Sequence, residues 1–203
     1  MAGSRDPETG LPDGVLGYGL GPEWRPGPDG LPFRSAARVI LLDRADRVLL
    51  LRGHDAVDTA RSWWFTVGGG LDAGENARDG AVRELQEETG LRVVPDELEG
   101  PVLTRSAVFD FSHVTCRQDE EFFLARVDET DLDVGGWTAL EQEVVDEVRW
   151  WPLDELDAAV ASGVVVYPAM LPELARRLAG GWDGSVLHVD ETSSSAPVPG
   201  RRR

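Results

Sequence analysis

The chain has 203 residues, a length that suits one domain with extensions, and a formal net charge of −17, which disfavours polynucleotides and anionic membranes as partners. All 20 basic residues are arginine, and the absence of lysine excludes Schiff-base and P-loop chemistry. Cys116 is the single cysteine, and the sequence has neither an apolar run of about 18 residues nor a signal peptide, so we expect a cytoplasmic protein without a disulfide.

The two ends of the chain differ in composition from its middle. Residues 1–34 are dense in glycine, proline and aspartate, with Trp24 and Phe33 as large anchors, which predicts an extended arm or disordered leader. Such an arm could also cross to a second copy of the chain in a homodimer. We expect the folded domain over residues 35–190 and a disordered tail over residues 191–203.

The first predicted elements are strands. Apolar runs at 36–42 and 47–52, joined by the polar residues 43–46, predict a β-hairpin. Residues 62–67 predict a third strand, which leads into three glycines at 68–70. We expect these glycines to form a turn, in which bare backbone carbonyls could reach a metal ion.

A helix is predicted over residues 77–89, because Asn76 can cap its start and Gly90 can adopt the left-handed conformation that ends it. Further strands are expected at 102–112, 121–127, 146–153 and 186–190, with a polar turn at 117–120 and helices at 154–162 and 168–178. Strands on both sides of one helix, followed by further helices, favour a mixed sheet between helical layers.

Three carboxylates share one face of the predicted helix. Glu84, Glu87 and Glu88 stand three and four positions apart, a spacing at which like charges destabilise a helix by roughly 0.2 to 0.5 kcal/mol per pair. Their clustering therefore indicates a bound cation, and oxygen ligands suit Mg²⁺ or Mn²⁺. Arg83 precedes Glu87 by four positions, so its guanidinium can hold that carboxylate.

The spacing of these residues matches every fixed position of the Nudix box, through Gly69, Glu75, Arg83-Glu84-Leu85, Glu87-Glu88 and Gly90-Leu91. The chain therefore resembles the Nudix hydrolase family, whose members cleave a nucleoside diphosphate linked to a further group. The resemblance implies an α/β/α sandwich with a mixed sheet. It also implies that the carboxylates of Glu84, Glu87 and Glu88 and the carbonyl of Gly68 bind the metal, and that Arg83 orients a carboxylate.

The function implied by the resemblance is Mg²⁺-dependent hydrolysis of the pyrophosphate bond in a small nucleoside diphosphate derivative. A nucleotide sugar such as ADP-ribose, a dinucleoside polyphosphate and a nucleoside triphosphate all remain open. The alternative is a non-catalytic module of the same fold that binds a ligand or regulates a partner. A metal-dependent isomerase on the same scaffold is a third, weaker alternative.

Residues outside the box complete the expected site. The motif does not identify the general base. An extra glutamate is a candidate for that base or for a further metal ligand, and the candidates are Glu120, Glu121, Glu141 and Glu143. Arg52 and Arg105 are candidate phosphate clamps. Trp64 is a candidate for stacking on a base, with filling of the core as the competing interpretation for both Trp63 and Trp64.

Overall fold

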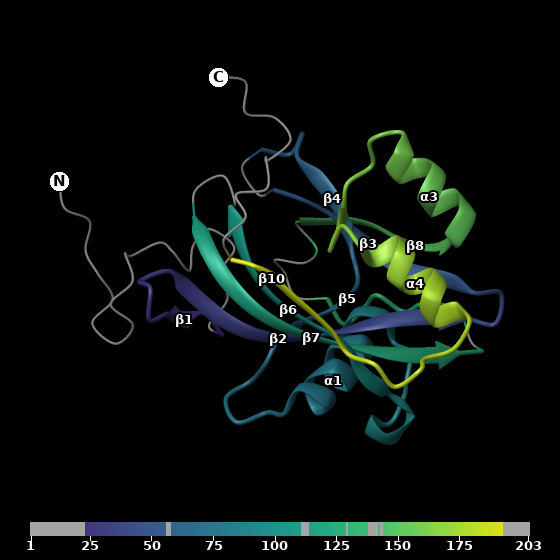
Figure 1. The fold of residues 1–203 in the computed structure, drawn as a ribbon, viewed down its shortest axis with the longest axis horizontal. Helices are drawn as coiled ribbons and strands as arrows, with labels where there is room; N and C mark the ends of the chain where they lie inside the picture. The colour runs from purple at the N-terminus through teal and green to yellow at the C-terminus, as the bar shows by residue number, and fades with distance from the viewer. Residues whose placement is uncertain are drawn as a thin grey trace.

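The structure, a computed structural model, describes residues 23–55, 58–110, 114–128, 130–137, 142 and 144–192. Its elements in chain order (Figure 1) are β1 Arg25–Pro26, β2 Pro32–Asp43, β3 Arg47–His54, β4 Ser62–Phe65, β5 Val67–Gly70, α1 Ala77–Thr89, the 3₁₀ helix η2 Pro95–Glu97, β6 Glu99–Asp110, β7 Thr115–Val127, β8 Val145–Pro152, α3 Leu153–Ala161, β9 Val166–Tyr167, α4 Leu171–Ala179 and β10 Leu187–Glu191. None of the helices in these residues is long and apolar enough to cross a membrane.

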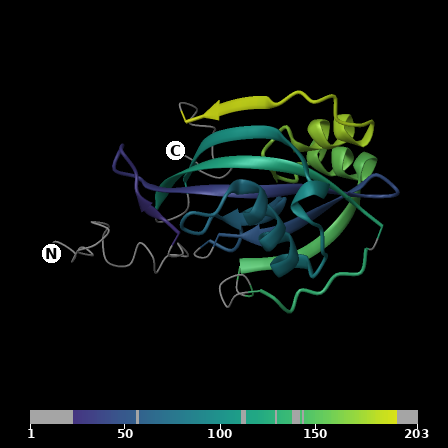
Figure 2. The same cartoon turned by 90° about the horizontal axis from the view of Figure 1, so that it is seen from below.

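The described strands form one mixed sheet, whose main path runs β10-β6-β7-β2-β3-β4-β9. β2 and β7 are parallel neighbours along their length, from Phe33 opposite Arg117 to Asp43 opposite Val127. β6 runs antiparallel to β7, and β3 runs antiparallel to β2. β5 pairs antiparallel with the middle of β2. Figure 2 shows the long strands bending together across the molecule. The predicted hairpin and the predicted mixed sheet are confirmed.

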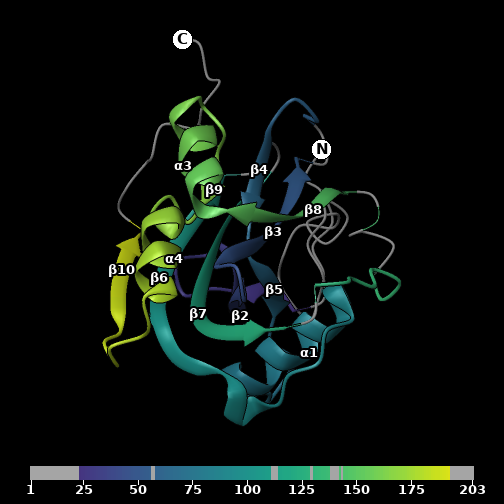
Figure 3. The same cartoon turned by 90° about the vertical axis from the view of Figure 1, so that its right-hand side faces the viewer.

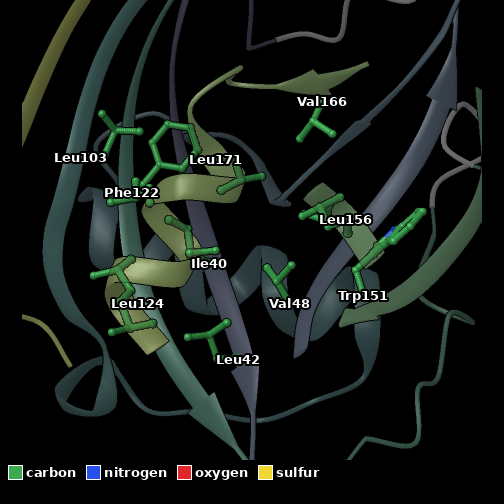
Figure 4. Packing of buried hydrophobic residues seen from close by; sticks show 14 of the residues in the cluster. Ile40, Leu42, Val48, Leu103, Phe122, Leu124, Trp151, Leu156, Val166 and Leu171 are labelled. Atoms are coloured by element: carbon green, nitrogen blue, oxygen red, sulfur yellow. The ribbon is translucent and has the colours of Figure 1, made fainter. Parts of the chain in front are cut away.

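Helices cover both faces of the sheet (Figure 3). Ile40 and Leu42 of β2 belong to a core completed by α3 and α4, which Figure 4 shows from close by. The intervening Val39 and Leu41 belong to a second core, completed by α1. Because both faces of β2 are buried, its sequence is a continuous apolar run rather than an alternation. This arrangement confirms the predicted α/β/α sandwich.

Helix α1 begins and ends where the sequence predicts. The Asn76 side chain accepts the backbone N–H of Asp79, and Gly90 ends the helix with a φ of 72°. α3, α4 and the edge strand β10 also lie close to their predicted ranges. Each of these elements is encoded by signals within a few residues, so local sequence suffices to place it.

The predicted glycine turn is wrong. Residues 68–70 belong to β5 and pair with β2, Gly68 lying opposite Arg38 and Gly70 opposite Ala36. Gly68 has a φ of 128°, and a Cβ atom at this position would collide with the carbonyl oxygen of Ala37. The glycines are therefore explained by the close approach of two strands and by an unusual backbone conformation, not by a reversal of the chain.

The predicted polar turn at 117–120 is also wrong, because these residues lie inside β7. Gln118 and Glu120 are buried and accept hydrogen bonds from arginines of neighbouring strands. The charge of these residues predicted that they would be exposed in a turn, whereas in the structure they are buried and have hydrogen-bond partners on neighbouring strands. The connection between β6 and β7 falls at 111–114, of which 111–113 lie outside the described residues.

Part of the expected N-terminal arm packs on the sheet. Trp24 is buried beside Cys116, β1 pairs with β2, and β2 already begins at Pro32, ahead of the boundary expected at residue 35. Residues 1–22 and 193–203 lie outside the described residues, so the arm over 1–22, its role in a homodimer and the tail stay predictions.

Candidate active site

Helix α1 presents its carboxylates to β5. Ala81 and Leu85 pack in the same core as Val67, which fixes the rotation of the helix. Residues on the adjoining face, Glu84 and Glu88, are consequently buried against the glycine strand rather than exposed.

Glu88 connects the helix directly to the strand. Its carboxylate accepts the backbone N–H of Gly68 at 2.7 Å, and the residue is 5% exposed. Its own backbone carbonyl accepts the indole N–H of Trp137 at 2.8 Å. A buried carboxylate that accepts a backbone N–H is held in one orientation, so Glu88 is the most constrained of the three glutamates.

Glu84 lies against the bare backbone of Gly69. A Cβ atom built at Gly69 would lie 2.7 Å from a carboxylate oxygen of Glu84, which is closer than real Cβ atoms approach. The absence of a side chain at position 69 therefore creates the space that the Glu84 carboxylate occupies.

Arg83 forms hydrogen bonds with three carboxylates. Its guanidinium donates to both carboxylate oxygens of Glu75 at 2.9 and 2.8 Å, to Glu84 at 2.8 Å and to Glu87 at 3.0 Å. It also donates to the carbonyl of Gly70 at 3.0 Å. The hydrogen bonds from Arg83 lower the pKa of Glu75, and those to Glu75 and then Glu84 raise the pKa of Arg83. Arg83 contacts Glu87 as predicted, but its bidentate partner is Glu75.

Glu75 is a site residue that the sequence reading did not assign. It is a fixed position of the box, and that position was the available signal. Its backbone N–H donates to the carbonyl of Asp72, and one of its carboxylate oxygens accepts the N–H of Asp72 at 3.0 Å, so the loop before α1 is closed locally. Glu75 thereby anchors the guanidinium from outside the helix.

The donor set fits a hard divalent cation in its chemistry. Two buried carboxylates and the exposed Glu87 offer oxygen ligands beside the Gly69 cradle. In the part of the chain that the structure describes, however, no three Asp, Glu, His or Cys side chains converge as a metal site requires. Arg83 binds one carboxylate oxygen each of Glu84 and Glu87, while the carboxylate of Glu88 faces the N–H of Gly68.

The carbonyl of Gly68, the expected backbone ligand, accepts a hydrogen bond from Arg38. The same guanidinium nitrogen donates to the carbonyls of Gly68 and Thr66, each at 3.1 Å. The sequence reading missed Arg38. The signal was a charged residue inside the otherwise apolar run of β2.

Glu120 and Arg105 form a buried ion pair with each other. Glu120 accepts from Arg105 at 2.8 Å and also from Arg38 and Gln118, while Arg105 additionally binds Glu191. Burial alone would raise the pKa of Glu120, but the charges of Arg38 and Arg105 lower it below its ordinary value. These contacts argue against the predictions that Glu120 is a general base and that Arg105 is a phosphate clamp.

The other candidate bases differ in exposure or lie outside the described residues. Glu121 is exposed, and it lines a groove of about 450 Å³ whose lining also includes Glu120, Arg105 and Leu71. Glu141 and Glu143 lie outside the described residues, so their candidacy stays a prediction.

Arg52 and Trp64 occupy different environments. Arg52 is half-exposed and lies 3.6 Å from Asp146 and 3.7 Å from Glu147, which leaves it accessible to a ligand. Trp64 is 6% exposed and packs edge to face on Trp151, with ring centroids 5.0 Å apart. The competing interpretation, that Trp64 fills the core, therefore agrees with the structure, and stacking on a base does not.

Known proteins resemble this chain in sequence and in fold. The NUDIX domain family matches residues 32–173. The uncharacterized Nudix hydrolase YvcI of Bacillus subtilis (strain 168) is 38% identical over 60 residues, which are 30% of this chain and 35% of that relative. The RNA pyrophosphohydrolase of Acidiphilium cryptum (strain JF-5) is 30% identical over 158 residues, which are 74% of this chain and 94% of that relative.

Among solved structures, the MutT protein from Methanosarcina mazei Go1 aligns with a TM-score of 0.51 at 20% sequence identity, over 72% of this chain and 93% of that one. This likeness concerns the fold.

Proposed function

Because the chain belongs to the Nudix hydrolase family, we propose that it hydrolyses the pyrophosphate bond of a nucleoside diphosphate derivative with the help of a divalent cation. The observation that supports this proposal is the placement of the Glu84 and Glu88 carboxylates against the bare backbone of β5, with Arg83 linking Glu84 to Glu87 and Glu75. A binding module without catalysis would not need this complete set of acidic groups.

Glu84, Glu87, Glu88 and the Gly68 carbonyl would hold Mg²⁺ or Mn²⁺. When bound, such an ion neutralises charge on the phosphoryl oxygens and lowers the pKa of water. Arg83 is anchored by its bidentate contact to Glu75 and by the carbonyl of Gly70, and it binds one carboxylate oxygen each of Glu84 and Glu87. Arg83 would therefore orient these two carboxylates toward the metal.

Glu87 is the glutamate best placed to face solvent. Its side chain is 53% exposed, whereas Glu84 and Glu88 are buried. An accessible carboxylate can accept a proton from a water molecule positioned for attack on phosphorus. Glu121, Glu141 and Glu143 remain the alternatives outside the box.

Two substrate classes are supported by different observations. The net charge of −17 favours a small substrate over a long polyanion, and half-exposed Arg52 offers a local phosphate contact. The second candidate is the 5′ end of an RNA, because the Acidiphilium relative aligned over most of its length is named an RNA pyrophosphohydrolase. Recognition of an RNA end would need contacts to a few terminal phosphates only.

A substrate panel tests both proposals. Purified protein is incubated with nucleotide sugars, dinucleoside polyphosphates, nucleoside triphosphates and 5′-triphosphorylated RNA, each with Mg²⁺ or Mn²⁺, and the products are identified by mass. Glu87→Gln should lower turnover by about 100-fold or more, as expected when charge stabilisation in the transition state is removed. Gln86→Ala, the exposed neighbour on α1, is the matched control. Binding of a nucleotide without turnover in either metal would favour the non-catalytic alternative.

A further inference from the structure

We propose that Arg38 is a positioning residue of the metal site, which sets the direction of the Gly68 carbonyl and is held in place by Glu120 as its buried counter-ion. The inference rests on the proposed function, since it concerns the metal that function requires. It assigns roles to two residues outside the Nudix box, Arg38 on β2 and Glu120 on β7.

Side chains from two other elements bind the backbone of Gly68. Its N–H is bound by Glu88 at 2.7 Å, and its carbonyl is bound by Arg38 at 3.1 Å. Gly68 has no side chain of its own, and a Cβ atom there would collide with Ala37. The orientation of its carbonyl therefore depends on partners outside β5, and among the described residues the Arg38 guanidinium contacts the carbonyl oxygen.

The guanidinium of Arg38 is well suited to this task. Its Nη1 bridges the carbonyls of Thr66 and Gly68, while its Nε donates to a carboxylate oxygen of Glu120. The planar fork makes these contacts simultaneously, so the Nη1 position is fixed by the Nε contact. A lysine, with a single charged nitrogen, can reach one side of this arrangement but not both.

Glu120 is needed because the arginine is buried. The Arg38 side chain is 13% exposed and that of Glu120 only 1%, and an unpaired charge in such surroundings is strongly unfavourable. Gln118 and Arg105 supply the remaining hydrogen bonds of the Glu120 carboxylate. Glu120 is thus fixed on all sides and acts as the anchor for Arg38.

Metal affinity of the full-length protein tests this role, measured with Mn²⁺ alone by the electron paramagnetic resonance signal of the free ion. Changing the partners of metal ligands typically lowers affinity 10- to 100-fold, so we expect Arg38→Lys to bind Mn²⁺ about tenfold more weakly. Arg126→Lys is the matched control, since Arg126 also donates to two backbone carbonyls, those of Leu178 and Ala179, but has no contact to Gly68 or Glu120 among the described residues. It should change Mn²⁺ affinity less than about twofold.

A second variant covers the possibility that Arg38→Lys fails to fold. Arg38→Gln leaves the Glu120 carboxylate bound to Arg105 and Gln118, so no buried charge loses all its partners, and this variant should stay folded while showing the tenfold defect in Mn²⁺ affinity. Wild-type affinity in folded Arg38→Gln or in Arg38→Lys, or an equal defect in Arg126→Lys, would overturn the inference and leave the proposed function intact. Failure of the wild-type protein to bind Mn²⁺ would overturn both.

Discussion

The carboxylate of Glu88 and the backbone N–H of Gly68 are joined by a hydrogen bond of 2.7 Å, which connects the helix of acidic residues to the strand that carries the expected carbonyl ligand. Replacement of Glu88 by alanine would leave the buried N–H without an acceptor, so the free energy of unfolding should fall by about 1 to 3 kcal/mol. Glu88→Gln keeps an acceptor oxygen and should retain most of this stability while losing metal affinity. Urea denaturation compares the two variants, and equal stability losses would contradict this account.

Gly69 is expected to be essential because of the carboxylate packed on it. In Gly69→Ala the new methyl group would lie 2.7 Å from a Glu84 oxygen, so Glu84 must move. We expect at least a tenfold loss of kcat with the fold retained by circular dichroism, since displacement of a metal ligand disrupts the site more than the core. Gly180→Ala is the control, because a Cβ atom there makes only an ordinary contact.

The ion pair of Glu75 and Arg83 should make stability depend on pH in the acidic range. Arg83 lowers the pKa of folded Glu75 below its ordinary value of 4.5, so the pair stabilises the fold fully above that pH. The stabilisation is lost as the pH falls through the lower pKa of the folded state.

Glu75→Gln removes this contribution. The difference in free energy of unfolding between wild type and variant should therefore be constant from pH 7 to about 5 and shrink in more acidic solution. Parallel stability curves of the two proteins over the whole range would rule out the assigned ion pair.

Trp64 and Trp63 should respond differently to removal. Trp64→Ala deletes a buried core side chain that packs on Trp151 and should lower the free energy of unfolding by about 3 to 5 kcal/mol. Trp63 is only half-buried, and its ring packs edge to face on Tyr167 with centroids 6.4 Å apart. Trp63→Ala should therefore lower the free energy of unfolding by less. A stable Trp64→Ala with a raised KM would instead favour the original stacking hypothesis.

The features that could be predicted from the sequence are those whose interacting residues lie close together along the chain. Helix α1 could be predicted to its end residues because Asn76 and Gly90 encode its limits locally. The pairing of Arg38 with Glu120 could not, since 82 positions separate the two residues and only the parallel register of β2 and β7 brings them together.

The same limit explains the two wrong turns. The role of Gly69 became visible only with Glu84 beside it, and the polar residues of β7 only with their arginines in place. Sequence patterns give the structural preference of each residue type, such as glycine for turns and charged residues for the surface. The glycines of β5 and the polar residues of β7 instead depend on side chains of other elements.

Arg83 lets mutually repelling carboxylates stay close together. Its guanidinium bonds to Glu75, Glu84 and Glu87 at once, so each negative charge has a positive partner nearby. One side chain therefore offsets the repulsion that the acidic spacing of α1 would otherwise impose, and a substitution of Arg83 should disturb all three carboxylates together.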